Sequence, residues 1–327
     1  MLLQTVVQEF LVAGQANGWS PATRRQYDRH LAWLTAWLAE HSGVVALSDV
    51  TRSLLREWLA AQRERWAPAT CRTAVIALRS LLAFCEAEGY GGGSLVTAIR
   101  VPSVPERVQR AVDRHEVEAL LRACEQPCQA GLTAEQAEAA RLRNAAIVAV
   151  LFDSILRASE LCGLDVEDVC LTRMRLAVRR KGGKEQLVRF CDRTADYLRA
   201  GMTTRGDYAA ENETALFVAI TGNRPGQRLT TNGLRIIVRR LGERAGVPDL
   251  SPHAFRRGGT VQAIELGAPD RMVQLHGGWS KVTMVTTYSR TLVADERFDA
   301  YQPMRAVNGT ASQLARETAS STRESSA

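Results

Sequence analysis

Lysine is scarce in this sequence. Only three of the 42 lysine and arginine residues are lysine, namely Lys181, Lys184 and Lys281, so arginine carries almost all of the positive charge. Two of the three flank a glycine pair in the segment VRRKGGKEQLVRF. Arginine stays protonated at any working pH, whereas a lysine with a lowered pKa can give up its proton. The scarcity therefore raises the question of what lysine does here that arginine does not.

Other absences argue against whole classes of function. The seven cysteines are odd in number, with no second pair at zinc-finger spacing and no histidine cluster nearby, so most are expected to be buried thiols in a reducing compartment. There is no GxxxxGK[ST] loop and no tight carboxylate set for two-metal phosphoryl transfer. The sequence therefore predicts chemistry that uses neither a metal nor a cofactor.

Membrane and export signals are not predicted either. No apolar run reaches the ~18 residues needed to cross a bilayer. The N-terminus, MLLQTVVQEFLVAG, lacks the basic start and the cleavage site of a signal peptide. We expect a soluble, cytoplasmic protein.

What the chain has in excess is positive charge, with a net charge of +7 and a pI near 9.3. This favours a polyanionic partner, and nucleic acid before membrane because no basic amphipathic anchor stands out. A GC-rich coding bias that inflates arginine is the alternative explanation. Charge alone does not decide between the two.

The chain is long enough for two domains, and its first part reads as helices. Ser20 is a predicted N-cap with Pro21 at the first helical position, and five of the six tryptophans fall before residue 67, most of them on or beside apolar helix faces. We interpret them as core residues rather than base-stacking ones. The sequence predicts a helical domain over 1–98 and, from its prolines and lack of periodicity, a linker over 99–112.

The rest of the sequence predicts a mainly α domain with a small β-sheet, an α+β fold, over 113–305. RMRLAVRR and EQLVRF flank KGGK and predict a β-hairpin with the glycines in its turn. ETALFVAI, residues 213–220, predicts a further short strand. The polar, small-residue tail over 306–327 is expected to be disordered.

Five segments of this domain contain residues capable of chemistry. Each has a plain structural explanation by itself: a charge at a helix end, a solvated helix face, or packing. The candidates are Arg157 in ILRASELCGLDVEDV, Lys181 in the hairpin, His253 and Arg256 in SPHAFRRGGT, Trp279 in LHGGWS, and Tyr288 in TTYSR.

Taken in order, these segments resemble the catalytic domain of the tyrosine recombinases of the Xer and Cre type, also called phage-type integrases. In that family an Arg lies in GxRxSEL, a hairpin Lys follows in GKGxK, and HxxR comes later. A His or Trp then precedes the nucleophilic Tyr by nine residues, the spacing of Trp279 and Tyr288. The resemblance covers about residues 110–300, and the N-terminal helices resemble the family's SAM-like core-binding domain.

The resemblance implies a site-specific recombinase that cleaves and rejoins DNA through a 3′-phosphotyrosyl intermediate. Tyr288 is then the nucleophile, and Arg157 and Arg256 hold the non-bridging phosphate oxygens while staying charged at any working pH. His253 exchanges a proton, and the indole N–H of Trp279 donates to one more phosphate oxygen.

Lys181 is then the proton donor to the leaving 5′-oxygen, a task that arginine does not perform. The positive charges of Arg179 and Arg180 would lower its pKa. Glu160, one helical turn from Arg157, is expected to orient that guanidinium. Residues expected to contact DNA are Arg179, Arg180, Lys184 and Arg257, although Lys184 is as well explained as a solvated turn residue.

Three positions depart from the family pattern. Ile155 and Arg180 replace glycines, and Arg257 stands where a His is common. His276 lies close to Trp279 in the sequence, but the nine-residue spacing to Tyr288 favours Trp279.

The expected partner is a double-stranded recombination site, with inverted repeats, bound by a homotetramer on two duplexes in the nucleoid. The helix predicted at 294–304 either docks on a neighbouring subunit or packs on its own domain. A catalytically silent DNA-binding protein and a type IB topoisomerase are the alternatives that remain open.

Overall fold

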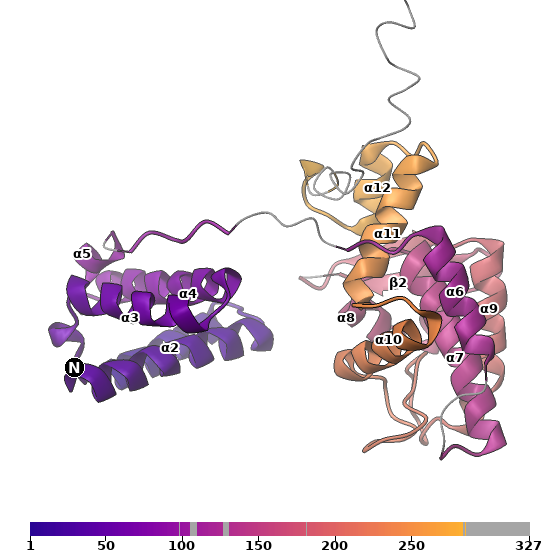
Figure 1. Cartoon of the computed structure of the whole chain (residues 1–327), viewed down its shortest axis with the longest axis horizontal. Coiled ribbons are helices and arrows are strands. Elements are labelled where there is room, and N and C mark those ends of the chain that lie inside the picture. The colour runs from indigo at the N-terminus through magenta and orange to yellow at the C-terminus, as the bar shows by residue number, and fades with distance from the viewer. Residues whose placement is uncertain (98, 105–109, 127–130, 181, 284, 286–327) are drawn as a thin grey trace, which may run out of the picture. The chain divides into compact units, whose positions relative to one another are not determined.

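The chain divides into two compact units, Met1–Arg107 and Val108–Ala327 (Figure 1). A computed structural model describes residues 1–97, 99–104, 110–126, 131–180, 182–283 and 285. Two domains are as predicted, whereas the boundaries at 98, 112 and 305 stay predictions. The tail and the helix predicted at 294–304 lie outside the described residues.

The first unit is helical. Helix α2 begins as the sequence predicts, because the hydroxyl of Ser20 accepts a hydrogen bond from the backbone N–H of Thr23 at 3.1 Å and Pro21 takes the first helical position. Trp58 is buried, and three other tryptophans pack against the same core. The helices are α1 (Leu3–Ala16), α2 (Pro21–Ser42), α3 (Arg52–Arg65), α4 (Pro68–Ala87) and α5 (Gly93–Val96), with a 3-10 turn, η1 (Leu47–Asp49).

Helix α4 is long and apolar enough to cross a membrane by length and composition alone. Buried helices of globular domains pass the same test. Its buried residues, among them Val75, Leu78 and Leu81, form the centre of the first unit's core together with α1, α2 and α3. The apolar character of α4 is therefore explained by packing within the unit.

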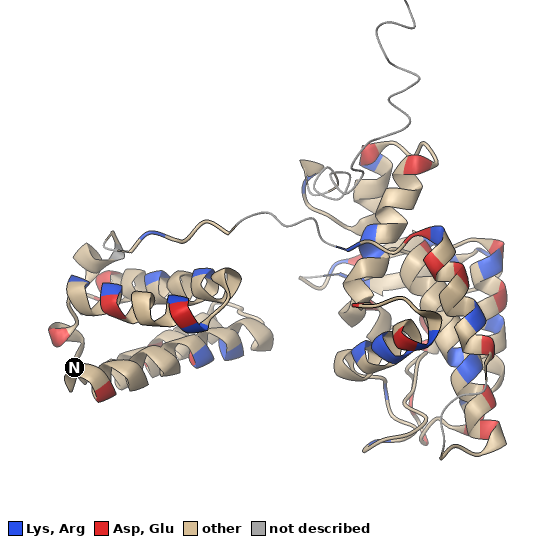
Figure 2. Ribbon diagram, in the orientation of Figure 1, with Lys and Arg blue, Asp and Glu red and all other residues tan. Residues whose placement is uncertain are grey.

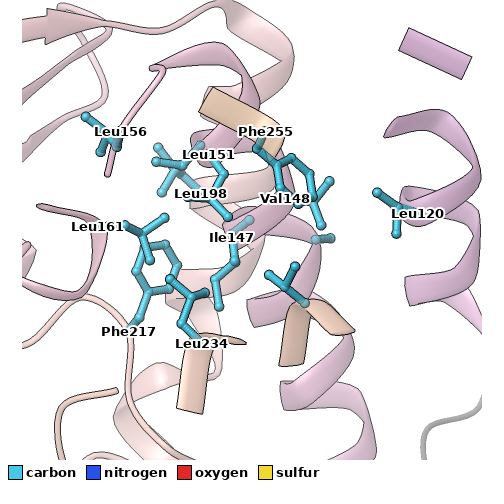
Figure 3. Packing of buried hydrophobic residues seen from close by; sticks show 14 of the residues in the cluster. Leu120, Ile147, Val148, Leu151, Leu156, Leu161, Leu198, Phe217, Leu234 and Phe255 are labelled. Carbon is cyan, nitrogen blue, oxygen red and sulfur yellow. The ribbon is translucent and has the colours of Figure 1, made fainter. Parts of the chain in front are cut away.

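The second unit is built around α7 (Ala134–Asp153), which makes its most extensive contacts with three other helices. Figure 3 shows Ile147, Val148 and Leu151 of α7 among buried residues from the surrounding elements. A helix that is apolar on nearly all sides of its C-terminal half has to be surrounded. The surrounding helices are α6 (Arg114–Glu125), α9 (Asp192–Thr203) and α11 (Pro252–Glu265), and the others are α8 (Ala158–Cys162), α10 (Thr231–Ala245) and α12 (Asp270–Gly277).

The sheet has three antiparallel strands in the order β1 (Val169–Cys170), β2 (Arg175–Arg179) and β3 (Glu185–Arg189). The predicted hairpin is confirmed. Gly182 and Gly183 in its turn have φ of +85° and +75°, values that glycine adopts without the steric cost of a Cβ.

The strand predicted at 213–220 is wrong. This segment forms only isolated bridges, at Ala215 and Val218. Its backbone bonds to two separate segments: Leu216 donates to the carbonyl of Leu164 at 2.8 Å, and Ala219 donates to that of Gln227 at 2.9 Å. Side chains bind it as well, because Arg205 donates to the carbonyl of Ala215 at 2.7 Å and Arg143 donates to that of Val218 at 3.0 Å. Alternation of apolar residues does not reveal such long-range partners.

The predicted linker is attached at both ends. Ile99 is buried in the first unit, and its carbonyl accepts a hydrogen bond from Arg79 at 3.0 Å. Val112 is buried in the second unit and donates its backbone N–H to Ala254 of α11 at 3.1 Å. The two ends of the 99–112 segment therefore belong structurally to the units that they join.

Candidate active site

The sequence predicts that Arg157 lies at the end of the long apolar helix. In the structure it instead begins the next helix. Helix α7 stops at Asp153, the chain turns through Ile155, and Arg157 is the N-cap of α8. Ile155 has φ of +54°, which is strained for a β-branched residue. Glycine adopts this backbone conformation without strain, which explains why the family has glycine where this chain has Ile155.

Glu160 binds Arg157 twice. Its Oε2 accepts from the backbone N–H of Arg157 at 2.8 Å, and its Oε1 accepts from Nη1 of the same residue at 2.6 Å. The carboxylate is almost fully buried, whereas 37% of the Arg157 side chain remains exposed. Glu160 thus fixes a guanidinium that still reaches the surface.

Glu160 is also the centre of a larger group that we call the arginine cluster, namely Glu160 with Arg157, Arg180 and Arg256. Oε2 of Glu160 lies 2.6 Å from Nη1 of Arg180 and 3.8 Å from Nη1 of Arg256. A buried carboxylate needs such partners to offset its desolvation. Three guanidiniums against one carboxylate leave the cluster net positive, as an anion-binding site requires.

Arg256 is 1% exposed and is held from three sides. Its Nη1 donates to the carbonyl of Ile155 at 2.6 Å, and its Nη2 donates to that of Gly277 at 2.7 Å. Its guanidinium carbon lies 4.1 Å from the centroid of the Trp279 ring, within the range of a cation–π contact. A Cβ at position 277 would come 1.8 Å from that ring, which explains Gly277.

His253 lies one turn before Arg256 on α11. Although the residue keeps exposed surface, burial of the ring, followed by the charges of Arg257, Arg256 and Arg157, lowers the pKa of His253 to about 4. The imidazole is therefore neutral near pH 7. A neutral imidazole can accept a proton from a phenol.

His276 and Trp279 occupy different places beside the cluster. A hydrogen bond joins His276 to the backbone of Asp153, and burial is the main cause that lowers the pKa of His276. Trp279 lies against Arg256, as noted above. The structure thus places Trp279 against the guanidinium of Arg256. The hydrogen bond from the Trp279 indole to phosphate stays a prediction.

Two of the predicted DNA contacts need correction. Arg180 and Arg257 are 8% and 7% exposed, and their guanidiniums bind the protein: Arg180 binds Glu160, and Arg257 donates to the carbonyl of Arg110 at 2.7 Å. Neither lies open to a phosphate backbone. Arg179 and Lys184 are exposed, and their DNA contacts stay predictions.

Lys181 and Tyr288 lie outside the described residues, so their roles stay predictions. The described chain reaches Arg180 and Gly182 on either side of Lys181. Ahead of Tyr288, Val285 is buried with Ile155 and Trp279 in one cluster.

Some functional candidates were missed by sequence reasoning. Gln186 of β3 donates to the carbonyl of Leu275, a contact between residues 89 apart that no local pattern reveals. Helix α10 exposes Arg235, Arg239 and Arg240, and Figure 2 shows basic residues along this helix. The sequence could have revealed the arginines of α10, because the helical spacing of its apolar residues determines which arginines face outward.

A metal site is not evident in the part of the chain that the structure describes, because no three His, Cys, Asp or Glu side chains there form a group that could hold an ion. The arginine cluster itself is suited to an anion.

Comparison with known proteins agrees with this geometry. Residues 110–294 match the phage integrase family, and residues 8–89 match the phage integrase N-terminal SAM-like domain. Tyrosine recombinase XerC of Mycobacterium sp. (strain JLS) is 30% identical over 283 residues, which are 85% of this chain and 91% of the relative.

Two solved structures share the fold. XerH site-specific recombinase, bound to a palindromic difH substrate in a post-cleavage complex, has a TM-score of 0.66 at 16% identity, covering 86% of this chain and 80% of that one. A lambda integrase tetramer bound to a Holliday junction has a TM-score of 0.65 at 14% identity, covering 88% and 77%. Because the family match spans more than half of the chain, and XerC aligns over most of its length, this chain belongs to the phage integrase family of tyrosine recombinases.

Proposed function

We propose that this recombinase cleaves and rejoins DNA through a 3′-phosphotyrosyl intermediate, without metal or ATP. The observation that carries the proposal is the arginine cluster, in which Glu160 orders Arg157 and Arg256 beside a neutral His253. Phosphodiester attack creates extra negative charge on the non-bridging oxygens, and fixed guanidiniums stabilise that charge without reorganising.

The reaction balances without an outside reagent. The phenol oxygen of Tyr288 attacks phosphorus and forms the new P–O bond, while the bond to the 5′-oxygen breaks. The phenol proton passes to His253, and the 5′-oxygen takes a proton from Lys181. Rejoining reverses each step, so the energy of the broken bond is kept in the phosphotyrosine.

Two features prepare these proton transfers. His253 is neutral before DNA binds, because its pKa is lowered to about 4, and the negative phosphate will raise that pKa toward the range of a useful base. Lys181 follows Arg179 and Arg180, whose charges lower an ammonium pKa. Both charges are partly offset, because Arg180 lies 2.6 Å from Glu160 and Arg179 lies 3.9 Å from Asp165.

A nicked suicide substrate tests the proposal, because loss of the short 5′ strand traps the covalent intermediate. The wild-type chain should leave a denaturant-resistant protein–DNA adduct, and Tyr288→Phe should abolish it. Lys181→Arg should keep DNA affinity and lose most cleavage, with recovery when sulfur replaces the bridging 5′-oxygen. A chain that only shifts the DNA band, with no adduct, would be the silent DNA-binding protein.

The substrate and assembly follow from symmetry. We propose a site with inverted repeats and a tetramer on two duplexes, as the XerH complex with a palindromic substrate and the lambda integrase tetramer on a Holliday junction support. Such a tetramer joins each copy to its neighbours.

An apolar groove of about 570 Å³ offers a surface for that contact. It lies between β3, α11 and α12 and is lined by exposed Leu187, Leu266, Met272 and Leu275. The amphipathic segment 294–304 of a neighbouring copy is a fitting occupant. Truncation after Arg290 should then abolish synapsis of two DNA sites, and unaltered synapsis would reject this contact.

A further inference from the structure

We infer that Arg180 is a positioning residue, which fixes the base of the β2–β3 turn against the arginine cluster and the end of α12 and thereby sets Lys181 for proton transfer. The inference rests on the proposed function. It concerns a position where this chain departs from the family it resembles, since glycine is replaced by arginine directly before the hairpin lysine.

The Arg180 guanidinium binds three elements at once. Its Nη1 donates to Oε2 of Glu160 at 2.6 Å, its Nη2 to the carbonyl of His276 at 2.7 Å, and its Nε to Oε1 of Gln186 at 3.2 Å. The planar group presents its donors in a fixed fork, so these three contacts determine its orientation. A glycine at this position makes none of them.

The backbone of Arg180 closes the turn that contains Lys181. Its N–H donates to the carbonyl of Lys184 at 2.7 Å, and its carbonyl accepts from the N–H of Gly183 at 3.1 Å. The same residue therefore anchors the turn through the main chain and the arginine cluster through the side chain. Any shift of this guanidinium is passed on to the residue that follows it.

Three successive carbonyls at the end of α12 receive donors from the catalytic elements. The carbonyl of Leu275 accepts from Gln186 of β3, that of His276 from Arg180, and that of Gly277 from Arg256 of α11. The last carbonyls of a helix have no intrahelical partner and carry the negative end of its dipole, so they attract cations.

Arg180 packs closely against the end of α12. Gly278 ends α12 with φ of +66°, and a Cβ there would come 2.8 Å from Nε of Arg180. The hairpin and α11 thus both contact the last residues of α12, directly before Trp279. Arg180 thus ties the base of the β2–β3 turn to the phosphate-binding arginines.

The test compares two leaving groups. Arg180→Gln should lower the rate of adduct formation on the nicked suicide substrate by about 10- to 100-fold, the cost of a misplaced catalytic group. The rate should return to near the wild-type value when sulfur replaces the bridging 5′-oxygen, because a thiolate leaves without a proton. DNA affinity should not change, since Arg180 is buried.

Further variants isolate the cause. Combined with Lys181→Ala, the Arg180→Gln change should add no further loss. Gln186→Leu removes the bond to Leu275 and the acceptor of Arg180 Nε, but leaves both Nη bonds of Arg180 in place. It should therefore give a smaller loss with the same sulfur rescue, even if Arg180→Gln fails to fold. Arg199→Gln, which removes an exposed charge paired with Asp196 on α9, should cleave both substrates normally.

The outcomes separate this inference from the proposed function. If the wild-type chain forms no adduct that depends on Tyr288, the proposed function fails. If that adduct forms, the inference alone is overturned in either of two cases: both substrates slow equally in folded Arg180→Gln and Gln186→Leu, or both variants cleave ordinary DNA at the wild-type rate.

Discussion

At the scale of single residues, Ile155 shows two opposing contributions to stability. Its φ of +54° costs roughly 1–2 kcal/mol, whereas its buried side chain, packed with Val273 and Trp279, contributes about 2–5 kcal/mol. Packing therefore outweighs strain, and the residue is retained where the family has glycine. Its carbonyl also holds Arg256, so the strained turn positions a catalytic group.

Substitution at this position separates the two contributions. Ile155→Ala loses the side chain and keeps the strain, whereas Ile155→Gly loses both. We expect both variants to be less stable than wild type, with glycine more stable than alanine by about 1 kcal/mol, the reverse of the usual order. Thermal unfolding of the second unit measures this. Alanine equal to or above glycine would show that the turn is unstrained.

His253 predicts a dependence of stability on pH. Its pKa is lowered to about 4 in the folded chain, mainly by burial, from 6.5 when unfolded, so acid protonates the unfolded chain first. The stabilising contribution of this group is complete above pH 6.5 and is lost as the pH falls to about 4. The free energy of unfolding should therefore fall less over that range in His253→Asn than in the wild type, and pH-dependent thermal unfolding measures this. The difference should be no more than about 1 kcal/mol, because solvent screens an exposed residue. Parallel curves for the two proteins would contradict this.

At the scale of elements, the sequence predicts what local contacts determine. The start of α2 and the glycine hairpin follow from caps and turn residues within a few positions. The burial of Arg180 could not be predicted, because its partner carbonyl lies 96 residues away at His276. The resemblance to the family predicted the catalytic residues and the pairing of Glu160 with Arg157, but the contacts of Glu160 with Arg180 and Arg256 required the folded chain.

The glycine pair in α11 illustrates a requirement that only tertiary structure reveals. A Cβ at Gly258 would lie 1.9 Å from the carbonyl of Val112, and one at Gly259 would lie 2.1 Å from that of Phe152. These glycines let the linker and the end of α7 approach the helix that carries His253 and Arg256. Helix propensity alone favours alanine at such positions by about 1 kcal/mol.

Tertiary contact should override that preference. We expect Gly258→Ala to destabilise the second unit by more than about 2 kcal/mol, because the added methyl group meets a backbone atom that cannot move alone. Calorimetry of the full chain measures the change. Gly206→Ala is the control, since no atom beyond its chain neighbours lies within 4 Å of its added Cβ. A stabilised Gly258→Ala variant would mean that the linker does not rest on α11.

At the scale of the whole molecule, the linker joins the two units. Its ends are fixed at Ile99 and Val112, so less of the chain joins the units than the predicted 99–112. A short tether gives the second unit a high effective concentration once the first has bound DNA. Net charge of +7 adds attraction to phosphate that weakens as salt rises.

Lengthening this tether tests whether both units hold one site. Ten Gly and Ser residues inserted between 103 and 109 should weaken binding to a full DNA site by about 2- to 3-fold, because effective concentration falls as roughly the −3/2 power of tether length. Fluorescence anisotropy at a fixed salt concentration measures the affinity. The same ten residues added after Ala327 leave the tether unchanged and should have no effect. Equal affinities for the wild-type and lengthened chains would show that one unit binds DNA alone, and the basic linker would then only connect the two.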